Sequence, residues 1–161
     1  MAARQTLGGD GIIYVLNGLM TGQSAVFHTH NLRPVLNDLD QIACWRETGL
    51  GAPAGVHIDT GMNRLGLSED EVDAAQEDLS HVNLALIMSH LACASDPNHP
   101  KNHMQRDAFI ALSSRLPPAP LSLSASAGTL LGSDYSFDLT RPGIGLYGGG
   151  PFDRDHVPLQ P

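Results

Sequence analysis

The residues of this chain that could do chemistry are arginines, a histidine and small hydroxyl groups that follow apolar runs. The full set is Asn17, Asp59, Arg64, Ser89, His90, Ser124, Ser126, Arg141 and Gly143. In α/β proteins the carboxyl ends of the strands collect the functional residues. Guanidinium groups, an imidazole, hydroxyls and glycine N–H groups that meet there would suit an anion. The pattern therefore predicts an anion-binding site.

Each of these residues also has an explanation that needs no site. His90 could be a hydrogen-bonded core histidine, and Ser126 could cap the helix after its strand. The glycines of "GIGLYGGG" could serve tight turns only. Arg64 could be a solvated turn residue, and Arg141, held extended by Pro142, could form a surface ion pair. Composition and spacing leave these alternatives open.

A metal site and the common nucleotide motifs are not predicted. His90, Asp96, His99 and His103 invite a metal hypothesis, but Pro100 interrupts the pair at i, i+4 and no zinc spacing is matched. The sequence holds no G-x-S-x-G elbow, P-loop or G-x-G-x-x-G. We expect no metal.

Composition narrows the classes of partner and compartment. With 17 acidic against 9 basic residues the formal charge is −8, which argues against nucleic acid or an anionic membrane as the main partner. The two cysteines favour a reduced, cytoplasmic protein without a disulfide framework. No signal peptide or membrane span is expected, since no apolar run approaches 18 residues.

Apolar runs alternate with amphipathic segments along the chain. Strands are predicted in 11–18, 32–38, 54–60, 82–90 and 121–126. Ser68 and Glu71 form a capping box before a helix whose buried face carries Val72, Ala75 and Leu79. A later helix, ended by Pro117, is expected to face inward with Met104, Ala108, Ala111 and Leu112. Repeated strand and helix predict a parallel sheet, either a flavodoxin-like open sheet, slightly favoured by pattern, or part of a (β/α)8 barrel.

Five quoted segments resemble those of alanine racemase, a pyridoxal 5′-phosphate (PLP) enzyme of bacterial cell-wall synthesis. They are "IIYVLNGL", "RPVLNDLDQIACW", "VHIDTGMNRLGL", "MSHLACASDPNHPKN" and "SLSASAGTLLGSDYSFDLTRPGIGLYGG". The resemblance runs from about residue 11 to 151. It implies a fold of class α/β, a partial (β/α)8 TIM-type barrel from which the first strands and a C-terminal β domain are missing.

The resemblance also implies roles for individual residues. Arg64 would approach the phenolic oxygen of PLP and the substrate. Arg141 would donate to the pyridine nitrogen, which then stays unprotonated and makes the ring a weaker electron sink. His90 would orient that arginine. Ser126, with the N–H groups of Gly143 and Ile144, would hold the phosphate. Arg64 and His90 are thus the expected catalytic residues.

Two departures from the family pattern stand out. His57 occupies the position where many members carry a lysine, which puts the support of the neighbouring arginine in doubt. The single lysine, Lys101, does not lie on a segment resembling the first barrel strand, where the family has its Schiff-base lysine. The tyrosine of the partner subunit's β domain, the second base, also has no counterpart. We expect little or no racemase activity from this chain alone.

The resemblance therefore predicts an alanine racemase that interconverts L- and D-alanine through a PLP aldimine and supplies D-alanine for peptidoglycan, here as a fragment. A non-catalytic PLP- or phosphate-binding remnant or interaction module, and a serine or broad-specificity racemase, are the alternatives. Residues 1–161 would be the incomplete N-terminal barrel domain, with 151–161 as the start of a linker. A small-molecule substrate and, in the full-length form, a homodimer are expected.

Overall fold

Five short parallel strands form the centre of the protein. In the computed structural model, which describes residues 2–150, they are β1 (Ile13–Val15), β2 (Leu32–Leu36), β3 (Ala54–His57), β4 (Leu84–Met88) and β5 (Leu121–Ser122). Each strand pairs in parallel with the next one along the chain, so the sheet order is β1-β2-β3-β4-β5. The whole of β3 and the last three residues of β2 and β4 are buried, as expected for central strands whose faces are covered, whereas β1 at the edge is only partly buried.

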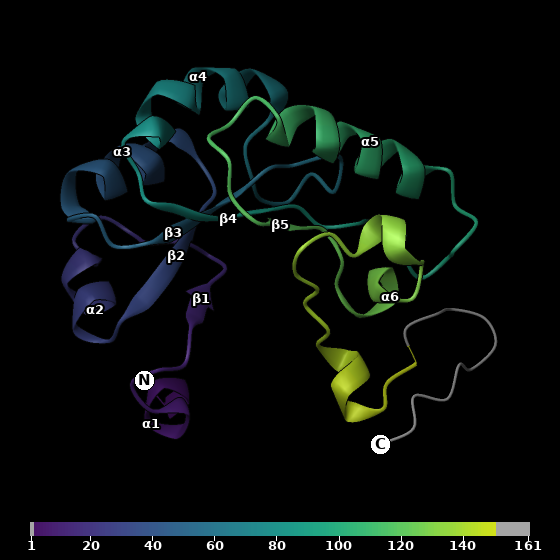
Figure 1. Ribbon diagram of the computed structural model, residues 1–161, viewed down its shortest axis with the longest axis horizontal. Helices are drawn as coiled ribbons and strands as arrows, with labels where there is room; N and C mark the ends of the chain where they lie inside the picture. Colours follow the sequence, from purple (N-terminus) through teal and green to yellow (C-terminus); the bar gives the residue numbers. More distant parts are fainter. Residues whose placement is uncertain (1, 151–161) are drawn as a thin grey trace.

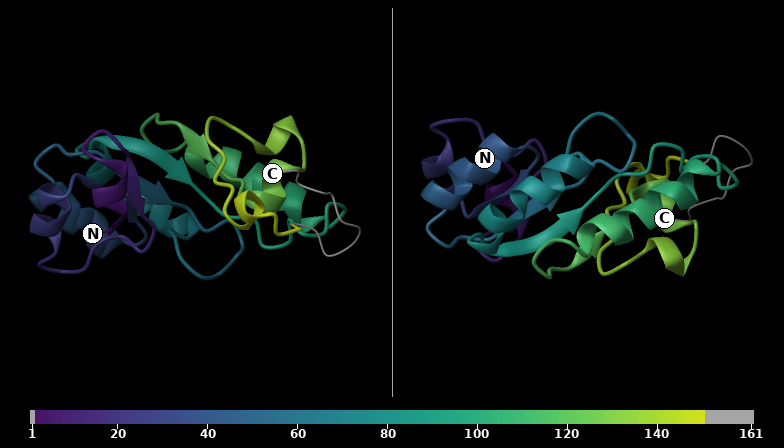
Figure 2. Two further views of the ribbon diagram at one scale, coloured as in Figure 1. Left: turned by 90° about the horizontal axis from the view of Figure 1, so that it is seen from below. Right: turned by 90° about the horizontal axis from the view of Figure 1, so that it is seen from above.

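Of the helices in residues 2–150, α2 (Ser24–Thr29), α3 (Leu39–Thr48), α4 (Glu69–Ser80) and α5 (Lys101–Ser113) lie along the outer side of this sheet (Figure 1). Helix α1 (Ala2–Leu7) precedes β1, and α6 (Ser126–Thr129) and the 3-10 turns η1 (Ser133–Tyr135) and η2 (Ile144–Tyr147) follow β5. Figure 1 shows α2 to α5 as an arc around the curved sheet. Figure 2 shows the N-terminal and C-terminal segments at opposite ends of it.

This order decides between the two architectures that the sequence pattern allows. A doubly wound open sheet reverses its strand order near the middle and carries helices on both faces. Here the order never reverses, and α2 to α5 stay on one side (Figure 1). The partial (β/α)8 barrel is confirmed, and the slight preference of the pattern for an open sheet is wrong.

One continuous core fills the space between the sheet and the helices. Leu36, Val56 and Ile87 of the strands are at most 1% exposed, and Phe27 and Trp45 pack edge-to-face beneath α2 and α3. The predicted capping box of α4 is present: the Ser68 hydroxyl accepts from the backbone of Glu71, whose carboxylate accepts from the backbone of Ser68. The predicted face of α4 is also confirmed, since Val72, Ala75 and Leu79 are buried.

The predicted inward face of α5 is confirmed at Leu112, which is buried, and is wrong at Met104 and Ala111. Met104 is 69% exposed and Ala111 is also exposed, whereas Phe109 and the polar Asn102 and Gln105 are almost fully buried. Hydropathy assigned the face to the aliphatic residues. The helix is instead oriented so that the side-chain amides of Asn102 and Gln105 form hydrogen bonds with the backbone of the preceding loop.

Three smaller differences separate the expected elements from the observed ones. The short helices α1 and α2 were not predicted, and β5 is limited to two residues of the run 121–126. The expected linker 151–161 lies outside the described residues. Among the helices of residues 2–150, none has both the length and the apolarity that a bilayer crossing demands.

Candidate functional site

The loop that carries Arg64 is built around the carboxylate of Asp59. One oxygen of Asp59 accepts from the backbone N–H groups of residues 61–63, at 2.8 to 3.1 Å. Asn63 takes a positive φ of 56° within this turn. Because the carboxylate is used to hold the backbone, Asp59 shapes the turn and does not line the main cavity. The turn thereby projects Arg64 from the end of β3.

The base of the same loop is closed by backbone pairing. Leu67 donates its N–H to the carbonyl of His57 at 2.8 Å and accepts from Asp59 N at 2.9 Å. Gly66 makes this closure feasible, because its φ is +108° and a Cβ there would lie 2.8 Å from Asp59 N. The loop is therefore fixed both at its turn and at its base.

Arg141 reaches the end of the sheet from the chain beyond β5. Its guanidinium donates to the Ser122 hydroxyl, to the Ser89 carbonyl at 2.6 Å and to the Leu123 carbonyl at 3.2 Å. Its backbone N–H donates to the carbonyl of Ser124 at 2.8 Å. These bonds tie the side chain to β5 and to the segment after β4, so the guanidinium is held in one place.

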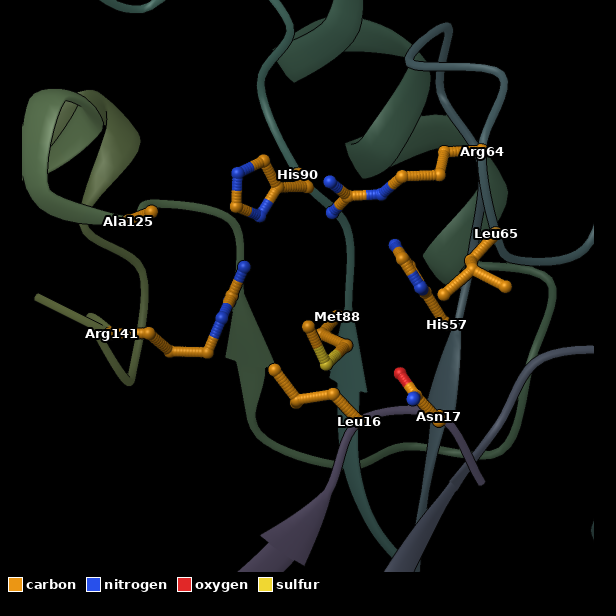
Figure 3. Close-up of a pocket in the computed structure, with 9 residues that line it drawn as sticks. All are labelled: Leu16, Asn17, His57, Arg64, Leu65, Met88, His90, Ala125 and Arg141. Carbon is orange, nitrogen blue, oxygen red and sulfur yellow. The ribbon is translucent and has the colours of Figure 1, made fainter. Parts of the chain in front are cut away.

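A cavity of about 480 Å³ opens at the carboxyl ends of the strands. The nine residues that line it are Leu16, Asn17, His57, Arg64, Leu65, Met88, His90, Ala125 and Arg141. Figure 3 shows the guanidinium groups of Arg64 and Arg141 entering it from different sides, with the ring of His90 near both. Three of the six predicted site residues, Arg64, His90 and Arg141, are thus brought together.

The cavity carries positive charge that no lining carboxylate offsets. Burial lowers the pKa of His90, and the charges of Arg141 and Arg64 lower it further. Burial also lowers the pKa of Arg141 to about 10, which still leaves the guanidinium protonated at neutral pH. Two cationic groups beside a neutral imidazole make a site for an anion.

His57 presents a defined tautomer to the cavity. Burial, followed by the charges of Arg141 and His90, lowers its pKa to about 4, so the ring is neutral at pH 7. Its Nδ1 lies 3.1 Å from the Oδ1 of Asn37, and Asn37 uses its Nδ2 to donate to the carbonyls of Leu16 and Val35. Since Asn37 can only accept at Oδ1, His57 Nδ1 carries the proton and Nε2 is an acceptor.

The predicted phosphate-binding residues form a separate group beside Ala125. The Ser126 hydroxyl accepts from the N–H groups of Gly143 at 2.8 Å and of Gly145 at 3.1 Å. None of the three lines the main cavity. The structure thus brings Ser126 and Gly143 together as expected, and it adds Gly145, whereas no hydrogen bond to Ser126 involves Ile144.

The sequence analysis did not predict the residues that position Arg141 and His57. Ser122 donates its hydroxyl to the carbonyl of Leu139 and accepts from Arg141, and Asn37 fixes the ring of His57. Their positions on inward-facing strand ends were the only available signal. Within residues 2–150, no group of three or more His, Cys, Asp or Glu side chains is arranged to hold a metal ion.

Comparison with known proteins gives the family context of this cavity. Residues 2–151 match the family model described as alanine racemase, N-terminal domain. The chain is 45% identical over 151 residues to an alanine racemase of Cereibacter sphaeroides, a match that covers 94% of this chain and 43% of that protein. A catabolic alanine racemase of Agrobacterium fabrum is 42% identical over 100% of this chain and 43% of its own length.

Comparison with solved structures also finds alanine racemases. The alanine racemase of Bartonella henselae, solved with covalently bound pyridoxal phosphate, superposes with a TM-score of 0.89 at 31% identity, over 99% of this chain and 50% of that one. The biosynthetic alanine racemase of Pseudomonas aeruginosa gives 0.84 at 29% identity, over 96% and 45%. The chain thus spans about half the length of the relatives that it matches.

Proposed function

We propose that this chain, which belongs to the alanine racemase family, forms part of an enzyme that interconverts L- and D-alanine with PLP as cofactor. The observation that carries the proposal is the cavity into which Arg64 and Arg141 both project without an opposing carboxylate. The named activity of its relatives and the bound cofactor of the Bartonella henselae enzyme support it.

The residues present fit PLP in charge and in size. The cavity volume of about 480 Å³ falls within the usual range for small-ligand sites. The guanidinium of Arg141 is an N–H donor that keeps its proton at neutral pH, as an unprotonated pyridine nitrogen requires. The Ser126 hydroxyl, which accepts from two glycine N–H groups, can donate its own proton to a phosphate oxygen.

The proposed contacts are those that the family resemblance implies. Arg141 would donate to the pyridine nitrogen, with His90 helping to orient it. Arg64 would face the phenolic oxygen and the substrate carboxylate. Ser126, Gly143 and Ile144 would hold the phosphate. When bound, PLP supplies the electron sink that makes the α-hydrogen of alanine acidic.

The groups that move the proton are proposed to come from outside this chain. Its one lysine, Lys101, is the first residue of α5 and is not among the nine residues that line the cavity. The Lys101 side chain lies near Gly61 in the loop after β3. We infer that residues 1–161 act as an incomplete PLP-binding barrel domain, with 151–161 beginning a linker to a β domain. The full-length enzyme would be a cytoplasmic homodimer that provides D-alanine for peptidoglycan.

A binding titration with PLP tests this proposal. We expect saturable binding that inorganic phosphate competes away and that Arg141→Ala weakens by about tenfold or more, as loss of a charge-assisted bond predicts. Chiral analysis of alanine should show no turnover above that of free PLP. Absence of saturable binding would refute the cofactor role, and measurable turnover would refute the external origin of the bases.

A further inference from the structure

A buried glutamine outside the cavity connects the segments that carry its charged residues. Gln105 of α5 is 1% exposed and does not line the cavity. Its Nε2 donates to the carbonyl of His90 at 3.0 Å and to the Thr60 hydroxyl at 3.2 Å, while its Oε1 accepts from Ala92 N at 2.8 Å. A backbone N–H and a carbonyl fix which end of the amide faces each partner.

The connection continues from Thr60 to Arg141. The hydroxyls of Thr60 and Ser89 lie 2.8 Å apart, and the carbonyl of Ser89 accepts from the guanidinium of Arg141 at 2.6 Å. Ser89 is itself 1% exposed. One chain of bonds therefore runs from Gln105 through the base of the Arg64 loop to Arg141.

The backbone of the Arg64 loop also faces the helix. A Cβ added at Gly61 would lie 3.3 Å from Cε of Lys101 and 3.8 Å from Cγ of Gln105. The loop therefore lies near α5 at Gly61 and is bonded to it at Thr60. The hydrogen bonds of Gln105 to Thr60 and to the His90 carbonyl set how far the loop stands from the segment of His90.

We propose that Gln105 is a positioning residue, whose single amide fixes the spacing between the Arg64 loop and the His90 segment. The proposal rests on the proposed function, because the two side chains so placed are those assigned to face PLP. A planar amide that is itself buried and bonded to three partners leaves little freedom to the groups that it joins. A displacement of about 1 Å in a positioning element is enough to weaken cofactor and substrate contacts strongly.

The test compares Gln105→Met with Asn102→Leu in the full 161-residue chain. Each change replaces a buried amide of α5 by an apolar side chain of similar size, but Asn102 bonds only to the carbonyl of Asp96, away from the cavity. Three quantities are measured: the pKa of His90 by NMR, hydrogen exchange of the Ala92 amide, and the Kd for PLP.

In Gln105→Met we expect the pKa of His90 to rise toward its ordinary value as Arg64 and Arg141 move away and water enters. His57, whose own pKa is lowered by the charge of His90, is a further titratable neighbour. The Ala92 amide should exchange faster, and the Kd for PLP should rise about tenfold. Asn102→Leu should lose stability but leave the His90 pKa and the Kd unchanged.

Equal effects of the two variants, or an unchanged His90 pKa in Gln105→Met, would overturn the proposal. Should Gln105→Met fail to fold, Thr60→Val breaks the same connection from the loop side and is expected to raise the His90 pKa. No change in Thr60→Val would then overturn it. If the wild-type chain does not bind PLP, the proposed function fails, while the His90 titration still decides the role of Gln105.

Discussion

Replacing Arg141 by lysine tests whether the guanidinium holds the end of the sheet together. The native side chain serves three acceptors: the Ser122 hydroxyl and the carbonyls of Ser89 and Leu123. A lysine has one nitrogen and cannot reach acceptors on two strand ends in the same fork geometry. At least one buried acceptor then loses its charged donor, at about 1.5 to 3 kcal/mol each. We expect the free energy of unfolding to fall by about 2 to 3 kcal/mol.

The assay is urea unfolding followed by the fluorescence of Trp45, the only tryptophan, which is 2% exposed. Arg46→Lys is the matched control, since Arg46 is a half-exposed arginine whose ion pairs with Asp78 and Glu47 lie on the surface. It should cost no more than about 0.5 kcal/mol. A loss in Arg141→Lys no larger than that of the control would refute the structural role of the guanidinium.

Three further predictions follow from the same contacts. The pKa of His57 is about 4 in the folded chain, below its value in the unfolded chain, so the unfolded state takes up the proton first as the pH falls. The free energy of unfolding should therefore be highest above about pH 6.5 and decrease by on the order of 3 kcal/mol toward pH 4. In urea titrations His57→Gln should make this dependence on pH weaker. Gly66→Ala should lower stability by about 2 kcal/mol or more in thermal melts, because its φ is +108° and its Cβ would lie against backbone atoms. The control Gly22→Ala, at φ +81° with no atom near the added Cβ, should cost about 1 kcal/mol. Equal losses in the two variants would contradict the close approach of backbone at Gly66. Ser126→Ala removes a hydroxyl donor and the acceptor that anchors Gly143 and Gly145, and it should raise the Kd for PLP about tenfold in a fluorescence titration. An unchanged Kd would exclude this hydroxyl from the phosphate site.

The strands and α4 could be predicted because their burial follows hydropathy. The apolar run of β4 marks a strand covered on both faces, and the capping box at Ser68 starts α4 where the structure starts it. The inward face of α5 could not be predicted in the same way. Gln105 is buried because loop backbone satisfies its amide, and hydropathy carries no information about those partners.

The same distinction applies to the candidate site, where some residues follow from local sequence pattern and others depend on contacts that are distant in sequence. Arg64, His90 and Arg141 could be found because each follows or flanks a strand end, where parallel strands of one sheet converge. The bond from Arg141 to Ser122 depends on how the sheet curves, which no local pattern encodes. Likewise, the tautomer of His57 depends on Asn37, a residue 20 positions away.

A crystal structure of the chain grown with PLP tests the central claim most directly. The account predicts the cofactor in the cavity that Arg64 and Arg141 enter (Figure 3). The pyridine nitrogen should lie within hydrogen-bond distance of the Arg141 guanidinium, and the phosphate should lie near Ser126 and Gly143. A cofactor bound with its phosphate against Arg64 and Arg141, or bound at another surface of the molecule, would contradict it.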